Sequence, residues 1–245
     1  MKIVFSRKGF DTKFGGGPSP IIDGKPVSLP IPASNGESTT YAERGLADAA
    51  ALASKGKHGG NSTCHDDPMF GDGHCWLGQV GAAQGHLRNQ NVGTGDVFLF
   101  FGLFAEPDTG ERHHRLFGFM RVLATGSPET IAESDRWRDP PRPHPHFRGD
   151  WHRNNAIWFG AGGTARTAGE VLRLTLPGER RWSRWRVPEW MAARRPTYLN
   201  GDWRWIDRRT LDTRGIWQEA VCDIGQAEEP RRWLESIIAE IEREP

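Results

Sequence analysis

The sequence predicts a single α+β domain over residues 1–245, built around a mixed, partly barrel-like β-sheet with flanking helices. Apolar strand-like runs are interspersed with segments whose apolar residues recur at helical spacing. No internal repeat and no long polar linker divides the chain. A chain of 245 residues also buries about 70% of the surface that its unfolded form exposes. It therefore needs neither a metal nor a disulfide framework to form a core.

The strands are predicted from short apolar runs bounded by turn residues. Val97–Ala105 is a continuous Phe-rich run, which indicates a buried strand. Arg115–Leu123 follows it across a polar loop and is predicted to be its hairpin partner. The predicted strands are residues 2–6, 25–30, 97–105, 115–123, 156–159, 170–175 and 215–223, and residues 197–206 are predicted to be extended.

The helices are predicted from caps and apolar stripes. The first is expected over Tyr41–Ser54, because Thr40 is a good N-cap and Glu43, three residues later, completes a capping box. The predicted helices are residues 41–54, 79–89, 128–134, 188–193 and 228–243. Residues 15–20, 55–73 and 136–153 are rich in Gly, Pro or His and are predicted to be loops.

The formal net charge of +1 excludes a histone-like polycation, but the charge is unevenly distributed. Residues 180–214 hold ten Arg and four acidic residues, a net charge of +6, whereas the chain from Trp217 onward has a net charge of −5. A local site for an anionic ligand is therefore compatible with the composition. We expect one nucleotide or one extruded base held in a pocket, with few phosphate contacts.

The cysteines are too few for a disulfide scaffold. Cys64, Cys75 and Cys222 are widely spaced, which suits a reducing compartment. No apolar run approaches ~18 residues, so no membrane span is expected. The first residues read as a strand, with no secretion signal. These features predict a cytoplasmic protein.

The Gly-rich segment after the first predicted strand is a candidate phosphate-binding loop. Gly15–Gly17 would present backbone N–H groups to an anion, and Lys8 would add a positive charge. The segment is not a Walker motif and does not fit the dinucleotide-binding spacing. A tight surface loop is the alternative interpretation.

One loop gathers six side chains of metal-binding type. Thiolate, imidazole and carboxylate ligands together suit zinc or iron, although no paired Cys-x-x-Cys is present. A catalytic His–Asp pair without a metal and a solvated polar loop are the alternatives. His86, on the next predicted helix, is placed to point back at this loop. The six are Cys64, His65, Asp66, Asp67, His74 and Cys75.

A second histidine pair, His144-Pro-His146, lies in the loop over residues 136–153. The proline holds the chain extended, so both imidazoles can face one side. Histidine serves as a base or as a metal ligand, and a plain surface loop is the alternative.

The basic segment over residues 180–214 also holds five Trp. Arg contacts phosphates and Trp stacks on exposed bases, which together would form a nucleic-acid surface. The alternative is that Trp182, Trp185 and Trp190 pack in the core and Arg lines the surface.

Two predicted central strands resemble those of small barrels of the PUA and EVE type, which bind flipped or modified bases. Gly95–Gly102 enters an apolar strand through Gly-Asp, and Leu116–Val122 carries a glycine within the strand. A glycine at such a position indicates close backbone approach beside a pocket.

Several stretches together resemble the nucleotide-modification-associated domain family, third type. The family's His-Leu-Asp-Pro-Asp-Leu loop is here His65-Asp-Asp-Pro-Met-Phe70, so Met69 replaces the later Asp. The resemblance implies an association with base or nucleotide modification and does not imply a particular reaction. The matching stretches are Ser6–Asp11, Gly16–Pro20, Ser28–Pro32, Gly78–Gln84 with His86 and Leu87, Gly95–Phe104, His144–His146, Asn154–Asn155 and Gln218–Glu219.

Three functions from different classes fit these observations. The first is an enzyme that acts on a nucleotide or nucleic-acid base, and the density of His and Asp on loops favours it. The second is a non-catalytic reader of modified bases, with a Trp cage near Phe101 and Phe119. The third is a structural or assembly protein with an adhesive Trp surface.

For the enzyme, the sequence and the resemblance together suggest three sets of residues, with iron or zinc as the divalent metal. The catalytic candidates are Asp11, His65, Asp67, Gln84 and His86. The substrate-binding candidates are Lys8, Gly16, Gly17, Ser19, Asn155, Gln218 and Glu219. The candidate metal ligands are His65, Asp67, His144 and His146.

Overall fold

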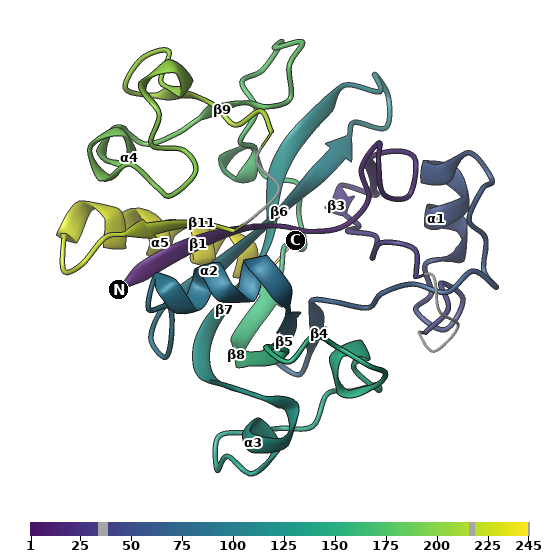
Figure 1. Cartoon of the computed structure of the whole chain (residues 1–245). Coiled ribbons are helices and arrows are strands. Elements are labelled where there is room, and N and C mark those ends of the chain that lie inside the picture. Colours follow the sequence, from purple (N-terminus) through teal and green to yellow (C-terminus); the bar gives the residue numbers. More distant parts are fainter. Residues whose placement is uncertain (34–38, 216–218, 245) are drawn as a thin grey trace.

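The predicted α+β class is confirmed in the computed structural model, which describes residues 1–33, 39–215 and 219–244 (Figure 1). The strands are β1 Lys2–Arg7, β2 Ser19–Ile22, β3 Lys25–Pro26, β4 Met69–Gly71, β5 His74–Gln79, β6 Val97–Ala105, β7 Arg112–Gly126, β8 Ala156–Thr164, β9 Arg184–Arg186, β10 Thr210–Asp212 and β11 Ala220–Asp223. The α helices are α1 Ala47–Ser54, α2 Gly81–Asn89, α3 Pro128–Ala132, α4 Glu189–Arg194 and α5 Glu228–Glu242.

The main sheet is mostly antiparallel and has the order β11-β1-β6-β7-β8-β5-β4. β1 pairs with β6 in parallel, and β2 adds a short parallel pairing to the far end of β6. Within the described residues, β11 pairs only with β1 and β4 only with β5. The backbone therefore forms no closed barrel there, and the likeness to PUA and EVE domains stays a prediction. Within the same residues, no helix is long and apolar enough to cross a membrane.

The core consists of two main clusters, one on each face of this sheet. Successive side chains of a strand point to opposite faces, so Ile3 and Phe5 of β1 join one cluster and Val4 joins the other. α5 and α4 cover the first face, and α2 packs against the second through Leu87. A smaller cluster around α1 carries the N-terminal loops that border the candidate site.

The first helix begins later than the sequence predicts. The expected capping box is present, because the Glu43 carboxylate accepts the Thr40 N–H at 2.7 Å and the Thr40 hydroxyl accepts the Glu43 N–H. The box closes a turn, however, and α1 starts only at Ala47. Leu52 of this helix is 70% exposed. Local hydrogen bonding thus fixed a turn without propagating a helix.

Other elements differ in type or extent. Residues 170–175 are not a strand, because Glu170–Leu172 form a 3₁₀ turn. The segment 197–206 contains a second such turn, Asp202–Arg204. The last predicted strand is confirmed only over β11, and residues 216–218 lie outside the described residues. The strand β5 was not predicted, although it supplies one wall of the candidate site.

The Trp residues of the basic segment divide between core and surface. Trp185 and Trp190 are buried in the cluster under α5, and Trp185 packs edge-on against Phe101 at a centroid distance of 4.7 Å. Phe119 is buried in the same cluster, so these rings fill the core rather than line an open cage. Trp203 is 63% exposed.

Candidate functional site

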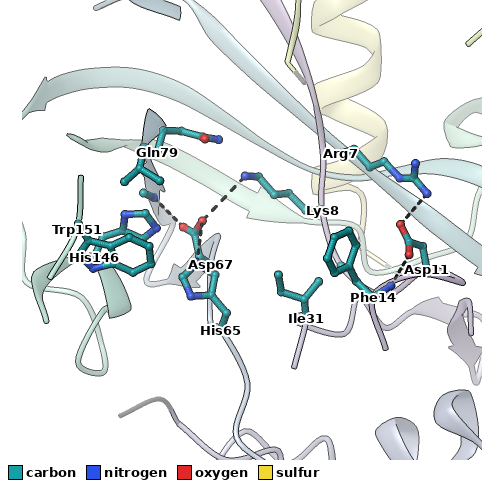
Figure 2. Close-up of a pocket in the computed structure, with 13 residues that line it drawn as sticks. Arg7, Lys8, Asp11, Phe14, Ile31, His65, Asp67, Gln79, His146 and Trp151 are labelled. Carbon is teal, nitrogen blue, oxygen red and sulfur yellow. Dashed lines mark hydrogen bonds and ion pairs between the residues drawn. The ribbon is translucent and has the colours of Figure 1, made fainter. Parts of the chain in front are cut away.

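A cavity of about 270 Å³ collects residues from segments far apart in the sequence. Its walls come from the end of β1 and the loop after it, from the loop before β4, from the end of β5 and from the segment before β8. Figure 2 shows two ends, with Lys8 and Ile31 between them. His65, Asp67, His146 and Trp151 form one end, and Arg7, Asp11 and Phe14 form the other.

The sheet curls to make this cavity possible. Three strands (β6, β7 and β8) lie between β1 and β5 in the sheet order, yet both β1 and β5 line the cavity with their last residues. Side chains link the two sides: Glu219, just before β11, accepts hydrogen bonds from Gln79 Nε2 at 2.7 Å and from Ser6 Oγ at 3.2 Å. Side chains therefore join the regions that the backbone ladder leaves apart. Lys8 Nζ lies 3.8 Å from the same Glu219 oxygen.

Asp67 presents its two carboxylate oxygens to different groups. Oδ1 accepts the Gly78 backbone N–H at 2.8 Å and lies 3.3 Å from His144 Nε2. Oδ2 lies 3.9 Å from His65 Nε2 and 4.0 Å from Lys8 Nζ. Burial alone would raise the pKa of Asp67, but the polar contact with His144 and the Lys8 charge outweigh it and hold the pKa below its ordinary value. The carboxylate is therefore charged at neutral pH.

His144 acts on Asp67 from behind the cavity wall. Its Nδ1 accepts the backbone N–H of His146 at 3.2 Å, so the proton of the neutral ring is on Nε2. Nε2 faces Asp67 Oδ1, and the His144 side chain is buried. Its Nε2 therefore approaches the carboxylate from behind the wall, as a close polar contact without the geometry of a full hydrogen bond.

His146 is held in the opposite tautomer. The amide Nδ2 of Asn155 donates to the His146 carbonyl at 2.8 Å, which turns the amide Oδ1 toward His146 Nδ1 at 2.7 Å. Nδ1 must then carry the proton, and Nε2 keeps a free lone pair. Burial lowers the pKa of His146 to about 4, so the ring is neutral at physiological pH.

Packing fixes the plane of the His146 ring. Trp151 stacks on it with a centroid distance of 4.1 Å and an interplanar angle of 5°. Trp151 is itself held, because its Nε1 donates to the Arg148 carbonyl at 2.7 Å. On the other side, a Cβ at Gly78 would lie 2.1 Å from the imidazole carbons, so only glycine leaves room for the ring.

Three side chains converge as a candidate metal centre. One ligand atom each from His65, Asp67 and His146 lies within 4.8 Å of the other two. Burial also lowers the pKa of His65, which keeps that imidazole in the neutral form that binds metals. Two imidazoles and one carboxylate are a donor set that suits iron(II) or zinc. The fourth predicted ligand, His144, is not part of this cluster.

The rest of the predicted metal-binding loop points elsewhere. Cys64 donates to the Thr39 carbonyl, and burial raises the pKa of its thiol to about 12. Cys75 is buried in the core, and all three cysteines are free. Asp66 is buried between Arg44 and Arg142. Of the six side chains in the loop, only His65 and Asp67 line the cavity.

Asp11 lines the other end of the cavity with its charge already compensated. Its carboxylate lies 2.8 Å from Arg7 and accepts the backbone N–H groups of Lys13 and Phe14. These contacts hold the loop that carries Phe14, a ring that is 43% exposed at this end. Asp11 is therefore placed to hold this loop in position.

Several predicted site residues lie outside the cavity lining. Gln84 accepts a hydrogen bond from Trp158, and His86 lies 3.0 Å from the Thr197 hydroxyl. Ser19 accepts the Leu29 N–H. Gly16 donates to the Asp11 carbonyl, and Gly17 packs against the Ala53 carbonyl. Gln218 lies outside the described residues. Asn155 and Glu219 contact the residues that line the cavity.

Some of the lining residues were not named as site candidates from the sequence. Gln79 and Trp151 were not singled out, because β5 was not predicted and because Trp151 stands in a loop with no periodicity. Arg7 and Phe14 flank residues that were named, but nothing in their spacing marks them.

The fold and the cavity together define a class: an α+β protein whose curled sheet carries a His/Asp cluster beside lysine, arginine and aromatic side chains. The family model described as nucleotide modification associated domain 3 matches residues 2–223. The chain therefore belongs to this family, which confirms the resemblance seen in its motifs. Neither the curated proteins nor the solved structures that were searched gave a match.

Proposed function

We propose that this protein is a metal-dependent enzyme that modifies a nucleotide or nucleic-acid base. The family supports the association with nucleotide modification. The observation that carries the enzyme is the convergence of His65, Asp67 and His146 within 4.8 Å at the wall of a cavity. A reader of bases needs no such cluster of ligand atoms.

The residues around the cluster fit a bound divalent ion. Burial lowers the pKa values of His65 and His146 and keeps both imidazoles neutral, whereas the Asp67 carboxylate is charged. Asn155 and His144 orient His146 and Asp67 in the manner of the outer partners of metal sites. When bound, a divalent ion polarises a bond of the substrate or activates water.

The remainder of the cavity suits a base more than a phosphate group. The charges of Arg7 and Asp11 offset one another, and Lys8 lies between two carboxylates. Phe14 offers an aromatic face. Gln79 Nε2 donates to Glu219, and Gln79 Oε1 accepts no hydrogen bond from the described residues. A planar ligand with N–H donors matches this surface.

Metal titration tests the cluster directly. We expect the chelator-treated protein to bind one Zn²⁺, or one Fe²⁺ without oxygen, in calorimetry. His65→Ala and Asp67→Asn should each weaken binding by at least about 100-fold, more than the loss of an outer partner. His152→Ala is the matched control, because His152 is an exposed histidine of the same segment whose ring, among the described residues, hydrogen-bonds only with Asn154.

Turnover separates the enzyme from the reader. The loaded protein is incubated with nucleotides and with single-stranded oligonucleotides, and the products are followed by mass spectrometry. A mass change that requires His65 and Asp67 supports the enzyme. Tight binding of a modified oligonucleotide that is recovered unchanged supports the reader. Absence of both metal binding and turnover overturns the proposal.

A further inference from the structure

The segment over residues 136–153, which joins α3 to β8, carries an excess of unpaired positive charge. It holds five Arg and two Asp, a net charge of +3. Arg142 pairs with Asp66. The other four are exposed and form no ion pair with any carboxylate among the described residues. These four are Arg136, Arg138, Arg148 and Arg153.

A second cavity, of about 610 Å³, lies against this segment and is lined by rings. Trp137 and Phe147 form its aromatic wall at a centroid distance of 5.4 Å, and Phe147 is 37% exposed. Arg148 stands at its edge. His144 also lines it, so this cavity lies next to the groups that hold Asp67.

One short turn connects this second cavity to the candidate metal site. The 3₁₀ turn Pro145–Phe147 presents His146 to the first cavity and Phe147 to the second. Trp151, which stacks on His146, belongs to the same segment. A ligand that occupies both cavities must therefore extend past this turn, where Arg148, one of the unpaired Arg residues, lies.

We propose that residues 136–153 bind the strand on either side of the target base, so that the substrate is a single-stranded polynucleotide rather than a free nucleotide. This rests on the proposed function for the base itself. Exposed Arg side chains are the common partners of phosphate oxygens. Exposed rings stack on bases without regard to sequence, which suits Phe147 to a neighbouring base.

The basic segment over residues 180–214 is less suited to this task, despite its larger net charge. Its Trp185 and Trp190 are core residues. Its Arg208 and Arg209 share the carboxylate of Glu189 at 3.0 and 3.4 Å, whereas four other exposed Arg residues form no ion pair among the described residues: Arg180, Arg181, Arg186 and Arg194. These four residues line neither of the two cavities on either side of the turn Pro145–Phe147, so they do not lie beside the target base.

Salt dependence of oligonucleotide binding tests the proposal. Anisotropy of a fluorescein-labelled single-stranded oligonucleotide is measured from about 50 to about 200 mM salt. Each lost phosphate contact lowers the magnitude of the log–log slope by about 0.7 for a single strand, so Arg148→Gln with Arg153→Gln should lower it by about 1.4. Phe147→Ala should weaken binding by about 5- to 140-fold at every salt concentration.

The control is the pair Arg208→Gln with Arg209→Gln, which removes the same charge from a surface where it is paired. We expect this pair to leave the slope unchanged. Equal slopes for both double variants would overturn the proposal, as would a mononucleotide that binds as tightly as the oligonucleotide. Polyglutamate that competes with the same salt slope as the oligonucleotide would also overturn it, in favour of an acidic protein partner.

A metal titration distinguishes failure of the strand proposal from failure of the proposed function. Arg148→Gln with Arg153→Gln should bind Zn²⁺ as the unmodified protein does. Metal binding without oligonucleotide affinity would overturn the strand proposal and leave the enzyme standing. Salt-dependent oligonucleotide binding without metal binding would overturn the metal-dependent enzyme and leave the strand-binding surface standing.

Discussion

Two groups of histidines in this protein show how the same residue type takes different roles. His65, His144 and His146 surround Asp67, whereas His113 and His114 lie within β7. In the first group, Asn155 fixes the His146 ring so that its Nε2 lone pair is free beside Asp67, and His144 faces the Asp67 carboxylate. In the second, the rings are packed: His113 Nε2 accepts a hydrogen bond from Arg115, and His114 Nδ1 accepts one from Trp185. Burial alone therefore does not mark a functional histidine, but convergence on open space does.

The largest difference between the two groups should appear in metal affinity. His146→Leu removes a ligand atom, so we expect Zn²⁺ affinity to fall by at least about 100-fold. His114→Leu leaves Trp185 Nε1 without its acceptor, which should cost about 1–3 kcal/mol in the free energy of unfolding and leave metal affinity unchanged. Calorimetry and urea unfolding measure the two effects. Equal metal affinity in both variants would remove the distinction.

Two adjacent asparagines offer a finer test of the first group. Asn155→Ala releases His146 Nδ1, so we expect metal affinity to fall by about 10- to 100-fold. Asn154→Ala breaks two hydrogen bonds to the Gly81 backbone and should lower stability only. The comparison is made by Zn²⁺ titration of both variants. An Asn155→Ala protein with unchanged affinity would show that the tautomer needs no second partner.

The close contact between Gly78 and His146 predicts a packing effect. Gly78→Ala places a Cβ 2.1 Å from the imidazole, so we expect a loss of about 1–3 kcal/mol in the free energy of unfolding and a displaced ring. Gly85→Ala is the control, because that position in α2 is open and alanine favours a helix by roughly 0.5–1 kcal/mol. Urea unfolding checks both. Equal stability of the two variants would mean that the His146 ring moves freely.

The sequence predicted the regular parts of this fold better than the site. The Phe-rich run over residues 97–105 matches β6 residue for residue, because a continuous apolar run of that length has few alternatives to a buried strand. The capping box at Thr40 shows the limit of local signals, since its hydrogen bonds form although the helix begins elsewhere. Nothing local distinguishes a box that starts a helix from one that closes a turn.

For the site, proximity in sequence was informative only in part. His65 and Asp67 are two residues apart and both line the cavity, but their neighbours Cys64 and Asp66 point into the structure. His146 could be named from its motif. Its role differs from that of His144 because their ring partners differ: His144 Nδ1 accepts a backbone N–H, whereas His146 Nδ1 donates to the Asn155 side-chain oxygen. The pairing of Gln79 with Glu219 depends on how the whole sheet curls, which no single segment encodes.

The second histidine group should make stability depend on pH. Burial, with the charges of Arg115 and Arg173, lowers the pKa of His113 to about 4, whereas an unfolded histidine has a pKa of about 6.5. Between these values the unfolded chain binds a proton that the folded chain resists, so stability falls as pH falls from about 6.5 toward about 4. His113→Gln keeps an acceptor for Arg115 but does not titrate, so its stability should fall less over this range. Urea unfolding at several pH values measures the difference, and parallel curves for the two proteins would show that His113 is protonated in the folded state as easily as in the unfolded chain.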